Sequence, residues 1–148
     1  ASGTAGMIGG QVVDIISEQE KPTAQLLQYI HHHKTGALLV ASVRTGAILG
    51  GADEAQLEAL TAYARQLGLA FQITDDILDV VGDEKKLGKP VGSDEKNEKA
   101  TFPALFGLEQ SRKMAQDAVE TAIAALEPIG EKGNILTELA RYLLEREN

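Results

Sequence analysis

The sequence predicts an all-α protein with a single domain. Its segments repeat apolar residues at helical spacing, and glycine and proline mark the breaks between those segments. Strand signals are missing, because aromatic residues make up only 4% of the chain and no hairpin dipeptide separates alternating runs. With 148 residues, of which 43% are hydrophobic, the chain is long enough to enclose one hydrophobic core.

The beginning of the chain already has helical spacing. Met7, Gln11 and Asp14 are separated by four and three positions, which places them on one face of a helix. No initiator methionine and no capped helix start precede them. We therefore expect the chain to begin inside an element and to be a piece of a longer protein.

A long apolar helix is predicted over 24–50. Pro22 is unfit for a helix interior, Thr23 suits a helix start, and the glycine pair at 50–51 suits its end. Apolar residues occupy nearly every side of this segment, so we expect it to be buried on all faces. Its alanines and glycines predict a close approach of neighbouring helices.

The next helix is predicted over 57–81, with Asp53 as its cap. The segment 82–99 breaks all periodicity with glycine, proline and charge, and predicts an exposed, mobile loop. Thr101 and Pro103 suit the start of another helix. The rest of the chain predicts an alanine-rich amphipathic helix over 111–126, a turn over 128–133 and a closing amphipathic helix over 135–147.

Composition and charge exclude several classes of protein. The formal net charge is -8, from 14 basic and 22 acidic residues, which argues against nucleic-acid binding. The absence of cysteine excludes disulfides, thiolate metal sites and a cysteine nucleophile, and it fits a cytoplasmic protein. The longest apolar stretch, 36–52, is interrupted by Arg44, and a charge near the centre of a membrane span is costly. We expect a soluble protein with neither signal peptide nor membrane span.

The segment FQITDDILDVV places three carboxylates inside an apolar run. Residues three and four apart share a helix face, so Gln72 lies beside Asp75 and Asp76, and Asp75 lies beside Asp79. Carboxylates this close repel one another unless a cation lies among them, and their oxygens suit Mg²⁺. The alternative is a solvated charged stripe, but the apolar neighbours leave little solvent-facing surface and favour a metal site.

Two segments that contain basic residues accompany the carboxylates, one at 31–35 and one in the loop over 82–99. Lys34 and Thr35, at the entry to the apolar helix, offer an ammonium and a hydroxyl to a phosphate, although a lone lysine is more often a surface residue. The histidines at 31–33 point in different directions and do not favour zinc. The loop lysines suit a lid over a metal–diphosphate, and their spacing is not that of a P-loop. These lysines are Lys85, Lys86, Lys89, Lys96 and Lys99.

The stretches GMIGGQVVD, HHKTGALL and GLAFQITDDILDVVGDEKKLGKPVGSDEKNEKATFPAL together resemble the C-terminal half of a trans-isoprenyl diphosphate synthase, of the polyprenyl synthetase family. The likeness is greatest to bacterial farnesyl diphosphate synthases and runs along nearly the whole chain. It implies an antiparallel helical bundle of the isoprenoid synthase type, here incomplete, and a homodimer. It also implies Mg²⁺-dependent condensation of isopentenyl diphosphate with an allylic diphosphate.

The resemblance assigns roles to particular residues. Asp75, Asp76 and Asp79 match the second aspartate-rich motif, which holds Mg²⁺ against the allylic diphosphate, Asp75 most directly. Lys34 and Thr35 match positions that contact this diphosphate. The remaining matches are a pocket-lining glutamine at Gln72, two diphosphate-binding lysines at Lys89 and Lys99, and cavity-wall positions at Gln11 and Asp14.

The resemblance also defines what residues 1–148 lack. The family needs a first aspartate-rich motif followed by adjacent arginines, and the chain has one Asp-Asp pair and only isolated arginines. We therefore expect a C-terminal half that needs its own N-terminal half and has no turnover alone. The alternatives are a geranylgeranyl or longer-chain synthase, a non-catalytic subunit of a heteromeric synthase, or a helical interaction module.

Overall fold

The computed structural model describes residues 1–18, 23–81 and 101–146. Within these ranges every regular element is helical, which confirms the predicted all-α class. The elements are α1 (Met7–Ile16), α2 (Ala24–Ile30), the π-helix η1 (His31–Gly36), α3 (Ala37–Leu49), α4 (Glu54–Val81), α7 (Phe102–Phe106), α8 (Leu108–Ala125), the 3₁₀ segment η2 (Glu127–Gly133) and α9 (Asn134–Glu145). The predicted loop over 82–99 lies outside the described residues.

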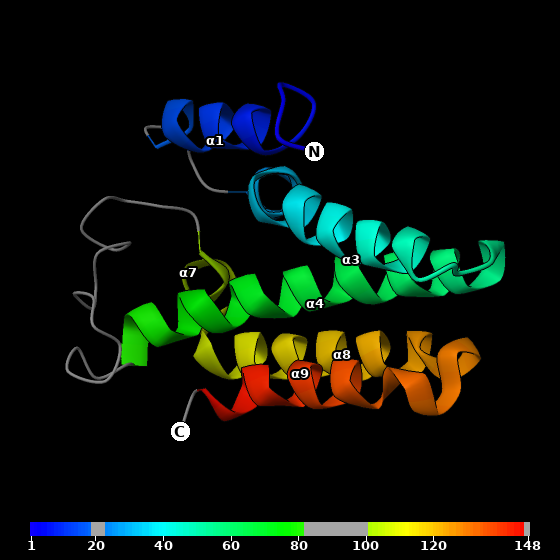
Figure 1. The fold of residues 1–148 in the computed structure, drawn as a ribbon. Coiled ribbons are helices and arrows are strands. Elements are labelled where there is room, and N and C mark those ends of the chain that lie inside the picture. The colour runs from blue at the N-terminus through cyan, green and yellow to red at the C-terminus, as the bar shows by residue number, and fades with distance from the viewer. Residues whose placement is uncertain (19–22, 82–100, 147–148) are drawn as a thin grey trace.

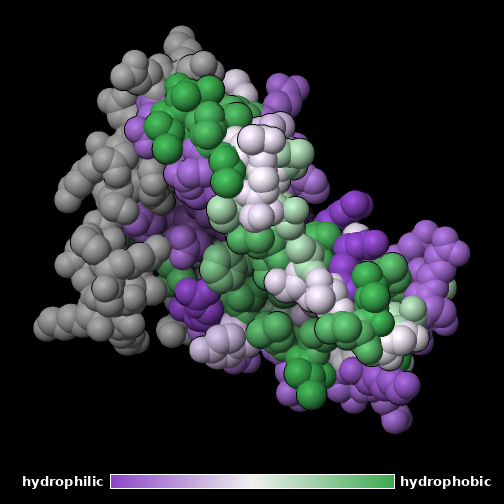
Figure 2. Space-filling view, turned by 45° about the horizontal axis from the view of Figure 1, so that its top comes forward, coloured by the Kyte–Doolittle hydropathy of each residue, from purple (hydrophilic) through white to green (hydrophobic). Residues whose placement is uncertain are grey.

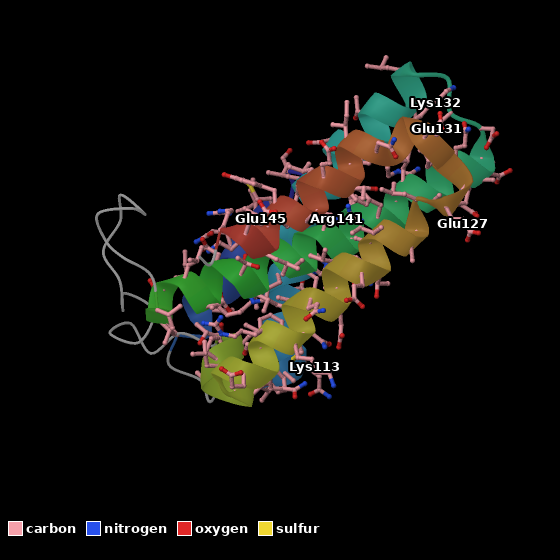
Figure 3. The ribbon with its side chains drawn as sticks, turned by 90° about the horizontal axis from the view of Figure 1, so that it is seen from below. Lys113, Glu127, Glu131, Lys132, Arg141 and Glu145 are labelled. Carbon is pink, nitrogen blue, oxygen red and sulfur yellow. The ribbon has the colours of Figure 1, made fainter. Side chains whose placement is uncertain are left out.

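The long helix α4 runs through the middle of the molecule (Figure 1). The segments α1 and α2–η1–α3 lie on one side of it, and α8 and α9 lie on the other. The outer surface of α8, η2 and α9 carries charged side chains, including those labelled in Figure 3. The C-terminal part of α4, which carries the three aspartates, therefore belongs to a helix that lies between two groups of helices.

The helix starts follow the capping residues that the sequence contains. The Thr23 hydroxyl accepts a hydrogen bond from the Leu26 amide at 3.2 Å, and the Thr101 hydroxyl accepts one from the Ala104 amide at 3.3 Å. Asp53 and Gln56 form a reciprocal capping box, because each side chain accepts from the other's backbone amide. These caps confirm the predicted starts of α2, α4 and α7.

The hydrophobic core lies where α4 contacts the helices that follow it. Tyr63, Leu67 and Ala70 of α4 pack with buried residues of α8 and α9, among them Val119 and Leu143. A second buried cluster consists of Leu27, Ile73, Ile77, Phe102 and Ala115. Because the second cluster joins α2, α4, α7 and α8, it fixes the start of α7 beside the carboxyl-rich end of α4.

The prediction for 24–50 is wrong in two respects. The segment is not one α-helix, because the π-helix η1 separates α2 from α3. It is also not buried on all faces, since α3 contains no buried residue and Leu49 is 82% exposed. The described residues cover α3 mainly from the α4 side, which leaves the apolar side chains of its other faces at the surface. The predicted close approach is present, since a Cβ on Gly68 would lie 3.5 Å from the Cα of Gly36.

Candidate functional site

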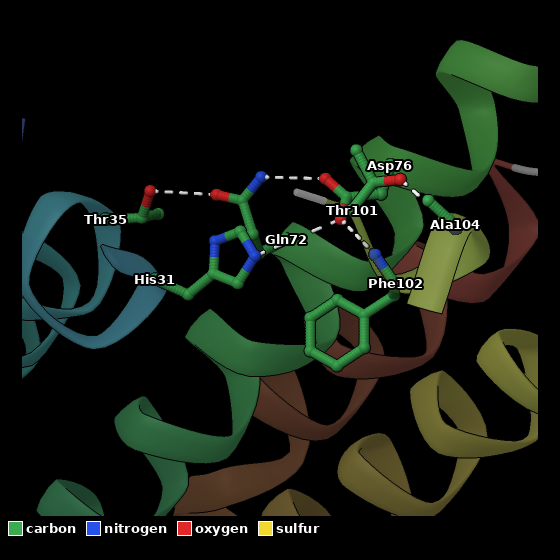
Figure 4. Close-up of polar contacts among 7 residues, drawn as sticks. All are labelled: His31, Thr35, Gln72, Asp76, Thr101, Phe102 and Ala104. Atoms are coloured by element: carbon green, nitrogen blue, oxygen red, sulfur yellow. Dashed lines mark hydrogen bonds and ion pairs between the residues drawn. The ribbon is translucent and has the colours of Figure 1, made fainter. Parts of the chain in front are cut away.

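The π-helix η1 places Lys34 and Thr35 between α1 and α4. The Lys34 Nζ lies 2.6 Å from Asp14 Oδ2 on α1. The Thr35 hydroxyl donates to Gln72 Oε1 on α4 at 3.0 Å (Figure 4). A π-helix adds a residue to the turn and often occurs at functional positions. Here it directs two successive side chains to two different helices.

The hydrogen bonds continue from Gln72 along α4. Gln72 Nε2 donates to Asp76 Oδ1 at 3.2 Å, and the backbone amide of Phe102 donates to Asp76 Oδ2 at 3.0 Å. Thr35, Gln72, Asp76 and Phe102 therefore form one connected chain across η1, α4 and α7 (Figure 4). The prediction that Gln72 and Asp76 share a helix face is confirmed.

The three aspartates of the motif differ in burial. Asp76 is 4% exposed and Asp79 is 3% exposed, whereas Asp75 is only partly buried. In the part of the chain that the structure describes, no three histidine, cysteine or acidic side chains form a group that could hold a metal ion. Mg²⁺ commonly takes one or two carboxylates and completes its shell with water and substrate phosphates. The partly exposed Asp75 fits that kind of coordination.

His31 is a buried neighbour of Asp76 that the sequence did not assign to this site. Its Nε2 lies 3.9 Å from Asp76 Oδ2, and its ring stacks on Phe102 with centroids 5.5 Å apart. Burial lowers the pKa of His31 to about 4, an effect that the nearby Asp14 carboxylate opposes in part. The imidazole is therefore neutral at pH 7.

The sequence could reveal only part of this arrangement. The capping Thr101 marks a helix start, and helix starts carry amide groups without helical partners, which is a signal for a nearby acceptor. No local pattern indicates that this acceptor is Asp76, 26 positions earlier in the chain. Gln11 and Asp14 lie one turn apart on α1 and are partly buried. Lys89 and Lys99 lie outside the described residues.

A cavity of about 590 Å³ borders the same region. His31, Phe102 and Gly36 contribute to its wall, together with Leu69 and Met114. None of the described candidates Lys34, Thr35, Gln72 and Asp75 lines it. The cavity therefore lies next to the hydrogen-bonded chain and is separate from the candidate diphosphate contacts.

Comparisons with known proteins identify the family of the chain. The polyprenyl synthetase family profile matches residues 1–139. The farnesyl diphosphate synthase of Escherichia coli (strain K12) is 47% identical over 151 residues, which cover 99% of this chain and 50% of that protein. The geranylgeranyl diphosphate synthase of Cyanophora paradoxa is 44% identical over 146 residues, covering 98% and 49%.

A solved structure also matches this chain over nearly its whole length. The geranyltransferase of Helicobacter pylori, complexed with magnesium and isoprenyl diphosphate, matches with a TM-score of 0.78 and 34% identity, covering 95% of this chain and 46% of that one. The chain belongs to the polyprenyl synthetase family. It spans about half the length of the curated relatives it matches. No helix in the described ranges is long and apolar enough to cross a membrane.

Proposed function

We propose that the protein takes part in Mg²⁺-dependent prenyl transfer, in which isopentenyl diphosphate and geranyl or dimethylallyl diphosphate condense to farnesyl diphosphate through an allylic carbocation. The observation that carries this proposal is the hydrogen bond of Thr35 of η1 to Gln72, which in turn contacts the aspartate-rich motif of α4. Lys34 is next to Thr35 and is paired to Asp14 of α1. The segment η1 thus places an ammonium close in sequence to a residue that contacts the carboxylate-rich helix. An ammonium and carboxylates are groups that recognition of a metal-bound diphosphate requires.

The candidate residues would divide metal binding, diphosphate binding and protection of the carbocation among them. Asp75 would hold Mg²⁺, with Asp76 and Asp79 beside Asp75 on α4, and the bound ion would supply positive charge against the leaving diphosphate. Lys34 would contact the diphosphate, with Lys89 and Lys99 as further cationic contacts. Thr35 and Gln72 would present oriented dipoles to the reacting end of the substrate. The apolar residues around them would keep water from the carbocation.

The chain would supply the C-terminal half of the enzyme. Its coverage of about half of each relative supports this view, as does the single Asp-Asp pair in its sequence. The resemblance supports a homodimer, and the absence of cysteine supports a cytoplasmic location. A geranylgeranyl product is the second candidate, because the 44% identical relative from Cyanophora paradoxa is named a geranylgeranyl diphosphate synthase.

The first test is the Mg²⁺-dependent binding of pyrophosphate to the chain itself, measured by calorimetry. We expect binding heat only with Mg²⁺ present, and a loss of affinity of about tenfold in Lys34→Gln, because one charge-assisted contact is removed. The matched control is Lys113→Gln, since Lys113 is exposed on α8 (Figure 3). Equal losses in both variants, or binding without Mg²⁺, would contradict the proposed site.

The second test is turnover. The chain alone, given Mg²⁺, isopentenyl diphosphate and geranyl diphosphate, is expected to form no product by mass spectrometry. A chimera that joins it to the N-terminal half of the 47% identical Escherichia coli relative is expected to form one, whose mass distinguishes farnesyl from longer chains. Asp75→Asn should raise the Mg²⁺ concentration that the chimera needs. Turnover by the chain alone would contradict the half-site proposal, and an inactive chimera would contradict the assigned activity.

A further inference from the structure

Asp76 is placed differently from the partly exposed Asp75 beside it. Its carboxylate is buried, and each of its oxygens accepts a hydrogen bond from this chain, one from Gln72 Nε2 and one from the Phe102 backbone amide. Figure 4 shows Asp76 directed toward Gln72 on one side and the start of α7 on the other. The carboxylate therefore joins two elements of the fold.

The chemistry of a carboxylate determines the direction of the whole hydrogen-bonded chain. The Gln72 amide presents its nitrogen to Asp76 Oδ1, which accepts this hydrogen bond. The amide oxygen then faces Thr35, whose hydroxyl must donate to it. A hydroxyl has one proton, and the Thr35 hydroxyl already uses it in the hydrogen bond that it donates to Gln72. Its remaining capacity is that of an acceptor.

The surroundings of Asp76 hold the carboxylate in place. The Phe102 ring, whose residue donates the backbone amide, stacks on His31 at an interplanar angle of 14°. His31 Nε2 lies 3.9 Å from Asp76 Oδ2. Phe102 is 1% exposed and belongs to a buried cluster with Ile73 and Ile77 of α4. The position of the carboxylate is thus determined by packing on the α7 side.

We propose that Asp76 is a positioning residue. It orients the amide of Gln72 and, through that amide, makes the Thr35 oxygen an acceptor toward the substrate. This role rests on the prenyl transfer proposed above, and it leaves the metal contact to Asp75, whose partial exposure leaves room for the water molecules that Mg²⁺ retains. Asp76 would act on the reaction through Gln72 and would not act through the metal.

Three variants test the direction of the hydrogen bonds. Asp76→Asn replaces an acceptor with an amide, so that either the Phe102 amide loses its partner or Gln72 must turn. Gln72→Glu places a second carboxylate against Asp76, 3.2 Å away in the native pair. The double variant exchanges the two groups. Thr35 and the new amide then both donate to the new carboxylate, the Phe102 amide keeps an acceptor, and the net charge is unchanged.

The first readout is the urea unfolding midpoint of the chain. We expect both single variants to lower the midpoint and the double variant to recover most of the loss. The matched control is the pair Gln116 and Glu120 on α8. Gln116 Nε2 donates to Glu120 Oε1 at 2.9 Å, the two residues are also four apart, and this hydrogen bond is exposed to solvent. The same exchange there is expected to change little. Additive losses in the Gln72 and Asp76 series would overturn the proposal, as would a double variant that does not fold.

The second readout is turnover in the chimera. Asp76→Asn is expected to lower kcat by about tenfold or more and to leave the Mg²⁺ concentration for half-maximal rate within about twofold. The double variant should regain activity. A raised Mg²⁺ requirement in Asp76→Asn, matching that of Asp75→Asn and not restored in the double variant, would make Asp76 a metal ligand and overturn the proposal. An inactive unmodified chimera would count against prenyl transfer alone, because the unfolding series decides the orientation independently.

Discussion

Tyr63 joins the middle of α4 to the last helix through one hydrogen bond. Its hydroxyl donates to the Leu136 carbonyl at 2.7 Å, and its ring is fully buried in the core between α4, α8 and α9. Burial raises the pKa of Tyr63 to about 12, because the ionised form would lose its hydration. The side chain therefore contributes both packing and a contact that depends on its proton.

The residue-scale prediction follows from that proton. Tyr63→Phe should lower the free energy of unfolding by about 1 kcal/mol at neutral pH, since it leaves the Leu136 carbonyl without this donor. The unfolded tyrosine ionises near pH 10 and the folded one near 12, so the native advantage is complete below about pH 10 and is lost toward about pH 12. Urea unfolding from pH 7 to 11.5 measures the difference. A constant difference across that range would contradict the prediction.

At this scale the sequence indicated which residues belong to the candidate site, but only in part which of these residues contact one another. The helical spacing of three and four correctly joined Gln72 to Asp76, because both belong to one helix. Contacts between helices, such as Thr35 with Gln72, could not be read from helical spacing, because the two residues lie on different elements. The bond from the Phe102 amide to Asp76 depends on how α7 packs on α4, and no local pattern contains that information.

At the scale of elements, α1 and η1 approach each other closely. A Cβ on Gly10 would lie 2.3 Å from the Lys34 backbone nitrogen and 2.8 Å from the His33 carbonyl carbon. Both are backbone atoms, which cannot move without displacing the helix. The absence of a side chain at Gly10 therefore allows α1 to contact the segment that carries Lys34 and Thr35.

Gly10→Ala should separate these two elements. We expect a loss of about 1–3 kcal/mol in the free energy of unfolding, the usual cost of overpacking. The matched control is Gly46→Ala in the interior of α3, where a Cβ would meet no atom within 4 Å. That change should raise stability by about 0.5–1 kcal/mol, because alanine favours helices over glycine. Similar effects of both variants in urea unfolding would show that the close approach does not matter.

The elements also show where the sequence was insufficient. The caps at Thr23, Asp53 and Thr101 depend on neighbouring residues and were predicted correctly. The π-helix within 24–50 was missed, because HHHKTG contains no proline and its one glycine also suits a packed α-helix. The exposure of α3 was missed because an apolar helix indicates that something covers it, without indicating what.

At the scale of the whole molecule, the two sides of α4 differ. The α8–α9 side contributes most of the core, although α9 also exposes Ile135 at 78%. The helices α1 and α3 expose large apolar side chains, among them Ile16 at 65% and Leu49 at 82%, and α3 has no buried residue. Figure 2, which brings the top of Figure 1 forward, shows hydrophobic residues gathered over this face. Exposed apolar patches of this kind favour association.

The last prediction concerns this face. Ile16→Gln combined with Leu49→Gln should reduce self-association in sedimentation experiments, because both side chains lose apolar contact area between copies. The free energy of unfolding, measured with urea, should change by no more than about 0.5 kcal/mol, since exposed positions contribute little to folding. The matched control is Ile135→Gln on α9, which is 78% exposed on the other side of α4. If Ile135→Gln reduces association equally, the α1–α3 face is not special. If association is unchanged in the double variant but falls in the control, the interacting surface lies on α9.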